Sequence, residues 1–331
     1  MALSDLTVYS EYVYTSMTEV LRQQIALFNT ASGGAVVLGQ KGVQGDFSDQ
    51  TFWAKISGLV RRRNAYGTGS VSEKVMEDLV DTMVKIAAGT PPVRLDPGQF
   101  KWIQKNPEEA GAVLGQQLAI DSLADMLNTA LGAGYAALGQ VSAVVHDTLA
   151  DDTTAPFTNK LDFNVLNSGQ ALFGDMASQI VAWVMHSKPM FDLYGAALTN
   201  AQQLFSYGSV NVKRDPFGKL LIMTDSPALT FTDTVPTPDV AAYATLGLTP
   251  GALTALQGND FTANEETKNG SENITKTYQA EWSWSLGVKG FAWDKANGGK
   301  SPSDAALFTA GNWDRIATSH KDLAGVVIKT H

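Results

Sequence analysis

The stretch that decides the fold of this 331-residue chain reads Tyr278-Gln-Ala-Glu-Trp-Ser-Trp-Ser-Leu-Gly-Val-Lys289. Its twelve positions alternate without interruption between apolar and polar or small residues, which indicates a β-strand with one buried face. Typical strands have about 5–6 residues, so a strand of this length needs an equally long partner, and we expect a helix. Trp282 and Trp284 share the apolar face. This period of two favours core positions for both indoles over stacking on a ligand.

Two long helices are predicted in the first half of the chain. Residues 6–28 carry apolar side chains three and four positions apart, and Ser32-Gly33-Gly34 follows as a stop signal. The motif Asn106-Pro-Glu-Glu109 is typical of a helix start, and the apolar pattern after it continues to about residue 140.

A further helix is predicted over residues 70–88. Ser70 and Glu73 have the spacing of a capping box, and Gly89 lies at the expected end. The apolar stripe between them consists of Val75, Met76, Leu79, Val80, Met83 and Val84.

Several shorter strands are expected. Residues 35–38 form a short apolar run. Residues 179–186 form a nearly continuous one that includes Trp183, as in a strand buried on both faces. Residues 210–212 and 219–224 flank Asp215-Pro-Phe-Gly218, the signal of a hairpin.

The stretch 39–69 is polar and contains several glycines, and it is expected to project as a loop with two strands. Its densest positive charge is the triplet Arg61, Arg62 and Arg63. These side chains could contact DNA phosphates, pair with carboxylates of a neighbouring subunit, or simply be solvated.

Composition limits the class of protein. The chain has no cysteine, a net charge of -9 and only 17% charged residues, against about 25% in typical proteins. A negative net charge does not suit a protein that wraps nucleic acid. A low content of charged residues is compatible with a surface that is covered by other protein subunits. No apolar run of about 18 residues and no signal peptide are present, so we expect no membrane partner.

Each catalytic or nucleotide-binding motif considered is absent, incomplete or in the wrong structural context. No H-E-x-x-H or G-x-S-x-G occurs, and Gly299-Lys-Ser301 lacks the first glycine of a P-loop, since Asp294 stands there. Gly132, Gly134 and Ala137 lie late in a helical pattern, which favours helix packing over dinucleotide binding. His186 ends an apolar strand and is interpreted as structural. We therefore assign no catalytic, cofactor or metal residue.

Glu265 and Glu266 are the remaining candidate functional residues. In their polar surroundings they could bind an ion or contact another subunit, although a solvated loop is the favoured interpretation. A hydrolase with an acidic site around Asp260 and Glu265 stays open as an alternative function.

Residues 179–289 resemble the major capsid proteins of tailed bacteriophages, which share the Hong Kong 97 fold. The resemblance lies in Ile180–His186, the hairpin Arg214–Asp225, Gly247-Leu-Thr-Pro-Gly251, the segment Asn259–Phe261 with Glu265–Gly270, and the strand quoted above. Val60-Arg-Arg-Arg-Asn64 and Val93-Arg-Leu-Asp-Pro-Gly98 extend it to most of the chain. It is most similar to the subgroup from short-tailed phages, of the kind that infect Bordetella.

The resemblance implies an α+β fold with an A domain, a P domain built on a long spine helix and a long sheet, and an E-loop that reaches a neighbour. The family commonly opens with an extended arm and the E-loop, whereas this chain opens with a long amphipathic helix, so its module order is expected to be unusual. The expected segments are a long helix in 1–34, an E-loop-like stretch in 35–70, a helical region in 71–150, an A-domain-like region in 151–258 and a β-rich, P-domain-like region in 259–331.

The function implied by the resemblance is self-assembly into pentamers and hexamers of an icosahedral shell around double-stranded DNA. Portal, separate scaffolding and cement proteins would be partners, and the subunit would assemble in the host cytoplasm and reside in the virion. The alternative with the same fold is an encapsulin-like shell around protein cargo. Because the first helix begins near Leu6, we expect the mature shell to contain the full chain, without covalent cross-links between subunits.

Overall fold

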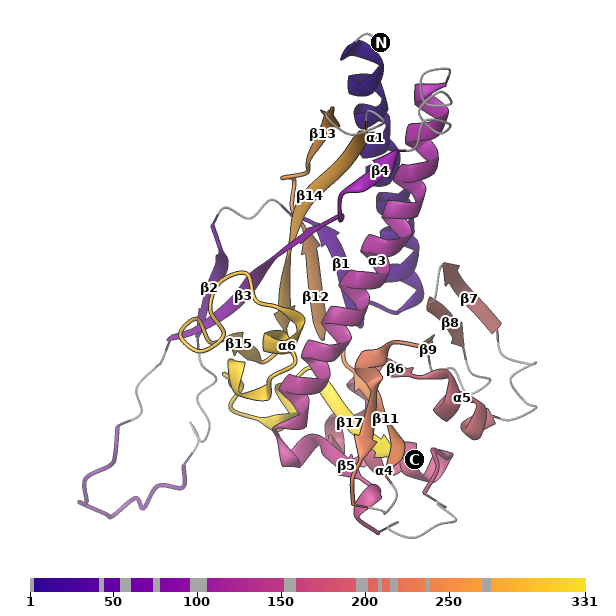
Figure 1. Ribbon diagram of the computed structural model, residues 1–331. Coiled ribbons are helices and arrows are strands. Elements are labelled where there is room, and N and C mark those ends of the chain that lie inside the picture. The colour runs from indigo at the N-terminus through magenta and orange to yellow at the C-terminus, as the bar shows by residue number, and fades with distance from the viewer. Residues whose placement is uncertain are drawn as a thin grey trace.

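The computed structural model describes residues 3–41, 45–53, 61–73, 78–95, 106–151, 159–194, 202–207, 210–214, 220–235, 239–269 and 275–331. Two sheets and two long helices dominate this part of the chain, which confirms the expected α+β class (Figure 1). The described helices are α1 (Leu3–Ala31), α3 (Pro107–Gly139), α4 (Phe163–Ala171), α5 (Ser187–Tyr194) and α6 (Asp304–Leu307). Both long helices were predicted. No described helix is long and apolar enough to cross a bilayer.

The first sheet is organised around β14, the strand predicted from the alternating stretch. Its described strands are β1 (Val36–Gln40), β2 (Phe47–Trp53), β3 (Asp78–Gly89), β4 (Val93–Leu95), β12 (Leu253–Gln257), β13 (Thr262–Lys268), β14 (Thr275–Val288), β15 (Phe291–Trp293) and β16 (Trp313–Arg315). Along β14, one edge pairs first with β13 and then with β12, and the other with β4 and then β3. Strand β15 also pairs with the end of β14, at Val288, so this strand of 14 residues has five shorter partners among the described strands.

The second sheet combines strands from distant parts of the sequence. Its described strands are β5 (Val145–Asp147), β6 (Ala182–Met185), β7 (Gln202–Tyr207), β8 (Val210–Arg214), β9 (Leu220–Thr224), β10 (Thr230–Asp233), β11 (Val240–Leu248) and β17 (Gly325–Thr330). Strand β17 lies between β5 and β11. The predicted buried strand is β6, flanked by β11 and β9, and the predicted hairpin is the antiparallel pair β8 and β9.

The helix predicted over residues 70–88 is wrong, because Asp78–Gly89 form strand β3. The first half of β3, residues 78–84, pairs with β2, and the second half, residues 84–89, pairs with β14. The sequence does carry a signal for this strand, since β-branched residues stand at alternate positions, Val80, Thr82, Val84 and Ile86. Ser70 and Glu73 lie exposed in irregular chain, and residues 74–77 of the expected stripe fall outside the described residues.

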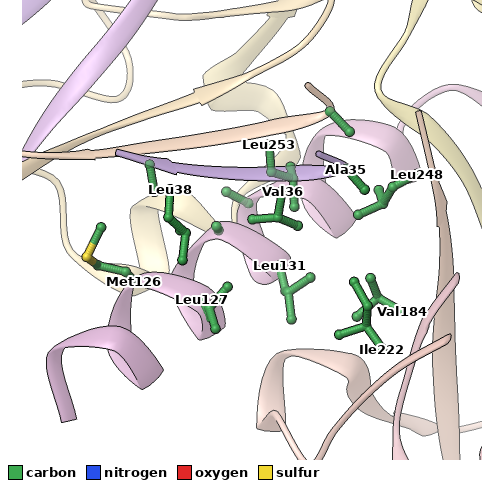
Figure 2. Packing of buried hydrophobic residues seen from close by; sticks show 14 of the residues in the cluster. Ala35, Val36, Leu38, Met126, Leu127, Leu131, Val184, Ile222, Leu248 and Leu253 are labelled. Carbon is green, nitrogen blue, oxygen red and sulfur yellow. The ribbon is translucent and has the colours of Figure 1, made fainter. Parts of the chain in front are cut away.

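Helix α3 packs against both sheets and joins their cores into one hydrophobic cluster. Figure 2 shows this junction with labelled side chains of α3 (Met126, Leu127, Leu131), of the first sheet (Val36, Leu38, Leu253) and of the second sheet (Val184, Ile222, Leu248). Glycines of α3 allow close contact, because a Cβ at Gly132 would overlap the Phe308 ring and one at Gly134 would touch Leu253. The predicted packing role of this glycine motif is confirmed.

The two long helices also touch each other through glycine. A Cβ on Gly111 would lie 2.8 Å from the carbonyl oxygen of Tyr9, and a Cβ on Gly115 would lie 2.6 Å from that of Val13. Both distances are too short for any side chain, so backbone meets backbone at this contact. The long helix pair beside the first sheet depends on these two positions.

Candidate assembly surfaces

The most exposed feature of the molecule is carried by strands β2 and β3. They pair antiparallel, from Phe47 opposite Val84 to Trp53 opposite Asp78. Residues 61–73, called the basic loop below, lie beyond the end of this pair and extend away from the body (Figure 1). Every residue of the basic loop is exposed, and Tyr66 is 95% exposed.

The base of this projection is fixed by ion pairs to the far end of the sequence. Lys295 Nζ lies 2.6 Å from Asp49 Oδ2, and Lys300 Nζ lies 2.9 Å from Asp46 Oδ2. The hydrogen bond from Lys295 lowers the pKa of the Asp49 carboxyl, and the Thr82 hydroxyl also donates to Asp49. Sequence reasoning missed these contacts because no local pattern relates residues about 250 positions apart. Ion pairs thus connect the base of the projection to the segment that contains Lys295 and Lys300.

Arg61, Arg62 and Arg63 stand at the start of the basic loop with all three side chains exposed. They make no ion pair with any described residue. Next to them, Asn64 Oδ1 accepts a hydrogen bond from the Tyr66 backbone N–H at 3.0 Å and shapes a turn. Within the described part of the chain, the triplet is thus presented to solvent.

Glu265 and Glu266 lie in strand β13 rather than in the solvated loop favoured from the sequence. Because side chains alternate along a strand, the two carboxylates point to opposite faces. Glu266 is exposed on the outer face, opposite Thr277 of β14. It lines a polar hollow of about 210 Å³ together with Thr262, Asn264, Thr277, Gln279 and Glu281.

Glu265 faces inward, opposite Tyr278. Both of its carboxylate oxygens are buried and have no hydrogen-bond partner among the described residues. Burial raises the pKa of Glu265 to about 7, and the positive charge of Lys276 only partly opposes this. Burial, followed by the charge of Glu265, raises the pKa of Tyr9 to about 12. Glu265 thus lies beside Tyr9 and Tyr278 as a buried carboxyl that makes no hydrogen bond to the described residues.

Asp260 is engaged elsewhere and does not share a site with Glu265. Its Oδ1 accepts from the Ser283 backbone N–H at 3.0 Å, and its Oδ2 lies 3.0 Å from Lys85 Nζ. Burial by itself would raise the pKa of Asp260, but the hydrogen bonds from Ser283 and Lys85 hold it below its usual value. A carboxylate that is held by Ser283 and Lys85 and has a lowered pKa is less suited to act as a general acid, which disfavours the hydrolase alternative.

His186 has a structural environment. Its Nε2 lies 3.5 Å from Asp225 Oδ1, and its ring packs against Tyr243 with centroids 5.1 Å apart. Asp225 also accepts a hydrogen bond from the backbone N–H of Ser187, and contacts with Ser187 lower the pKa of its carboxyl. Within the described residues, no group of three His, Asp or Glu side chains is arranged to hold a metal ion.

The three candidate core tryptophans are buried. Trp183, Trp282 and Trp284 retain 2%, 8% and 1% of their exposed surface. Trp183 covers Gly247 of β11, and Trp282 stacks on Phe261 with centroids 6.2 Å apart. Trp282 and Trp284 also border a cavity of about 490 Å³ between the first sheet and α3, so their burial agrees with core positions without testing a ligand role.

Comparison with known families identifies the class of protein. A family model described as major capsid protein 13-like matches residues 5–327, nearly the whole chain, so the protein is a capsid shell subunit. Within this class, the chain belongs to the Gp13-like family. No curated protein matches its sequence.

The solved capsid structures are only distantly similar to the chain. The capsid protein of Ralstonia phage GP4 is 11% identical with a TM-score of 0.49, over 91% of this chain and 88% of that one. That of cyanophage Pam1 is 11% identical with a TM-score of 0.48, over 88% of each chain. That of Helicobacter pylori bacteriophage KHP30 is 8% identical with a TM-score of 0.45, over 90% of this chain and 88% of that one.

Proposed function

We propose that this capsid subunit assembles as pentamers and hexamers into the icosahedral shell of a tailed phage and encloses double-stranded DNA. The family match over residues 5–327 carries this proposal. Its role is structural, without catalysis or cofactor. A portal, a separate scaffolding protein and a cement protein are its proposed partners, and assembly takes place in the host cytoplasm before the subunit becomes part of the virion.

The elements of the subunit suit the modules of the Hong Kong 97 fold. We assign the first sheet with α1 and α3 to the P domain, with α3 as the spine helix of 33 residues. The second sheet is assigned to the A domain, and β2, β3 and the basic loop to the E-loop. Strand β17 of the last expected segment pairs in the second sheet, so the A domain also includes the chain beyond residue 324.

The basic loop is the proposed contact with a neighbouring subunit. Three exposed arginines that make no ion pair with a carboxylate of the described residues can form bidentate ion pairs across a boundary, which lysines cannot reproduce. Glu266 on the exposed face of β13 is a proposed contact of the same kind, whereas the buried Glu265 is not.

Replacing Arg61, Arg62 and Arg63 together by alanine is expected to weaken assembly more than folding. Losing several charged contacts per interface should raise the subunit concentration needed for half-assembly by roughly tenfold or more, since about 1.4 kcal/mol corresponds to each factor of ten. The thermal unfolding midpoint of the free subunit should hardly change, because exposed side chains contribute little to folding. Light scattering and calorimetry measure the two effects.

The matched control for this prediction is the triple lysine variant, which keeps the charge and loses the planar guanidinium groups. Assembly intermediate between the wild type and the alanine variant would indicate bidentate pairing. Unchanged assembly of the alanine variant would contradict the proposed contact.

Electron microscopy of the purified protein or virion tests the function itself. The expected result is closed particles of multi-megadalton mass, or the smaller capsomers from which they form, with DNA as the content of the native shell. Protein cargo instead of DNA would favour the encapsulin-like alternative. A strictly monomeric protein over a wide concentration range would refute both.

A further inference from the structure

The contact between helix α1 and the ribbon formed by β13 and the first half of β14 contains a buried acidic side chain, Glu265, to which the proposed shell function assigns no role. Glu265 points from the ribbon toward α1, and neither of its carboxylate oxygens is reached by solvent or by a hydrogen-bond donor of the described residues. Tyr9 of α1 and Tyr278 of β14 meet edge to face at this point, with centroids 5.9 Å apart. The Tyr278 hydroxyl is also buried and has no hydrogen-bond partner in the described part of the chain.

We propose that the protonation state of Glu265 controls the contact between the β13–β14 ribbon and helix α1. The neutral side chain allows the ribbon to pack against the helix, and the ionised side chain weakens this contact. A neutral carboxyl tolerates burial without hydrogen bonds better than a carboxylate, which requires water or donors. Ionisation is accommodated if the ribbon moves off α1, or if Lys276 or the Tyr278 hydroxyl turns toward the charge. The first of these movements changes the contact between the helix and the long strand.

The groups around Glu265 determine the direction of the effect. Tyr9 faces it from α1, and Lys276 and Tyr278 face it from β14. Alternation along the strands places Glu266 and Glu281 on the opposite face of the ribbon, together with Arg94, which stands opposite Thr277. Lys276 is therefore the described cation on the inner face, and its attraction does not outweigh the burial of Glu265.

The sign of the pH dependence follows from the two states of Glu265. The folded chain retains its proton up to a pH of about 7, whereas the unfolded chain loses it near 4.5. The contribution of Glu265 to stability is thus greatest at low pH and falls as pH rises across this window. Since the ordinary carboxylates of a protein show the opposite trend, the Glu265 contribution must be isolated by comparison with a variant.

Glu265→Gln imitates the protonated form at every pH. The unfolding midpoint of the variant minus that of the wild type should be near zero at pH 5 and positive at pH 8, on the order of 3 °C. Glu266→Gln on the exposed face is the matched control and should show no such divergence. A Glu265→Gln difference that stays constant from pH 5 to pH 8 would overturn the proposal.

Hydrogen exchange of the wild-type chain provides a second test that does not depend on any variant. Amides of residues 262–268 and 275–281 should lose protection between pH 5 and pH 8 relative to those of β17, which serves as the internal reference. Equal pH responses of ribbon and reference would also overturn the proposal. Both tests report on the subunit itself, so they remain valid whatever particle the subunit forms.

Discussion

Trp284→Ala is expected to lower the free energy of unfolding by about 3–5 kcal/mol, the cost of deleting a large buried aromatic side chain. Trp284 is 1% exposed and lies in the middle of β14, opposite Ile86 of β3 and Gln257 of β12. Its indole belongs to the face that packs against α3, so truncation opens a cavity at the junction of the sheet and the helix. Denaturant unfolding of dissociated subunits measures the change.

Two further substitutions separate packing from other causes. The indole N–H of Trp284 has no hydrogen-bond partner in the described structure, so Trp284→Phe removes an unsatisfied donor together with part of the ring. We expect that variant to cost only about 1–2 kcal/mol. Phe191→Ala removes an aromatic ring that is 58% exposed and should cost less than about 0.5 kcal/mol. A Trp284→Ala cost as small as that of Phe191→Ala would contradict the core role.

Gly115→Val is expected to destabilise the subunit by about 1–3 kcal/mol or more, because the helices α1 and α3 cannot separate without losing their shared core. Any Cβ at position 115 would lie 2.6 Å from the Val13 carbonyl oxygen and 3.1 Å from the Met17 backbone nitrogen. These are backbone atoms of a helix, so they cannot turn aside as a flexible side chain would. Calorimetry of the variant subunit measures the loss.

Gly139→Ala is the matched control in the same helix. A Cβ at Gly139 meets nothing within 4 Å, and this glycine is exposed. The substitution should leave stability unchanged or increase it by up to about 1 kcal/mol, since alanine restricts the unfolded chain. If both variants were destabilised equally, the close contact between the helices would not be the cause.

Much of the fold could be predicted because its longest elements have unambiguous periods. The alternation from Tyr278 to Lys289 is too regular for a helix, and the spacing in residues 6–28 and 107–140 is too regular for a strand. Strand β3 was mistaken for a helix because its apolar residues satisfy both periods. Pairing with β2 and β14 decided between them, and that pairing is not visible in the local sequence.

The candidate surfaces could be predicted only in part. The exposure of the arginine triplet followed from its polar surroundings, but the receiving surface depends on a second subunit. Strand β13, with the sequence Thr-Ala-Asn-Glu-Glu-Thr-Lys, carries no apolar alternation and becomes a strand only through β14. The burial of Glu265 was missed for the same reason, because nothing near it in sequence reveals that Tyr278 and Tyr9 cover it.

The late position of strand β17 has a consequence for synthesis in the cell. Val327 pairs with Val145 and Val36 with Leu253, so both sheets join segments that leave the ribosome far apart in time. A nascent chain therefore exposes open sheet edges until residues 325–330 have been made, and such edges favour aggregation. Chains broken off before that point lack the strand between β5 and β11. Cells that produce many copies at once should accordingly depend on chaperones, and prematurely terminated chains should be excluded from the shell by failing to fold.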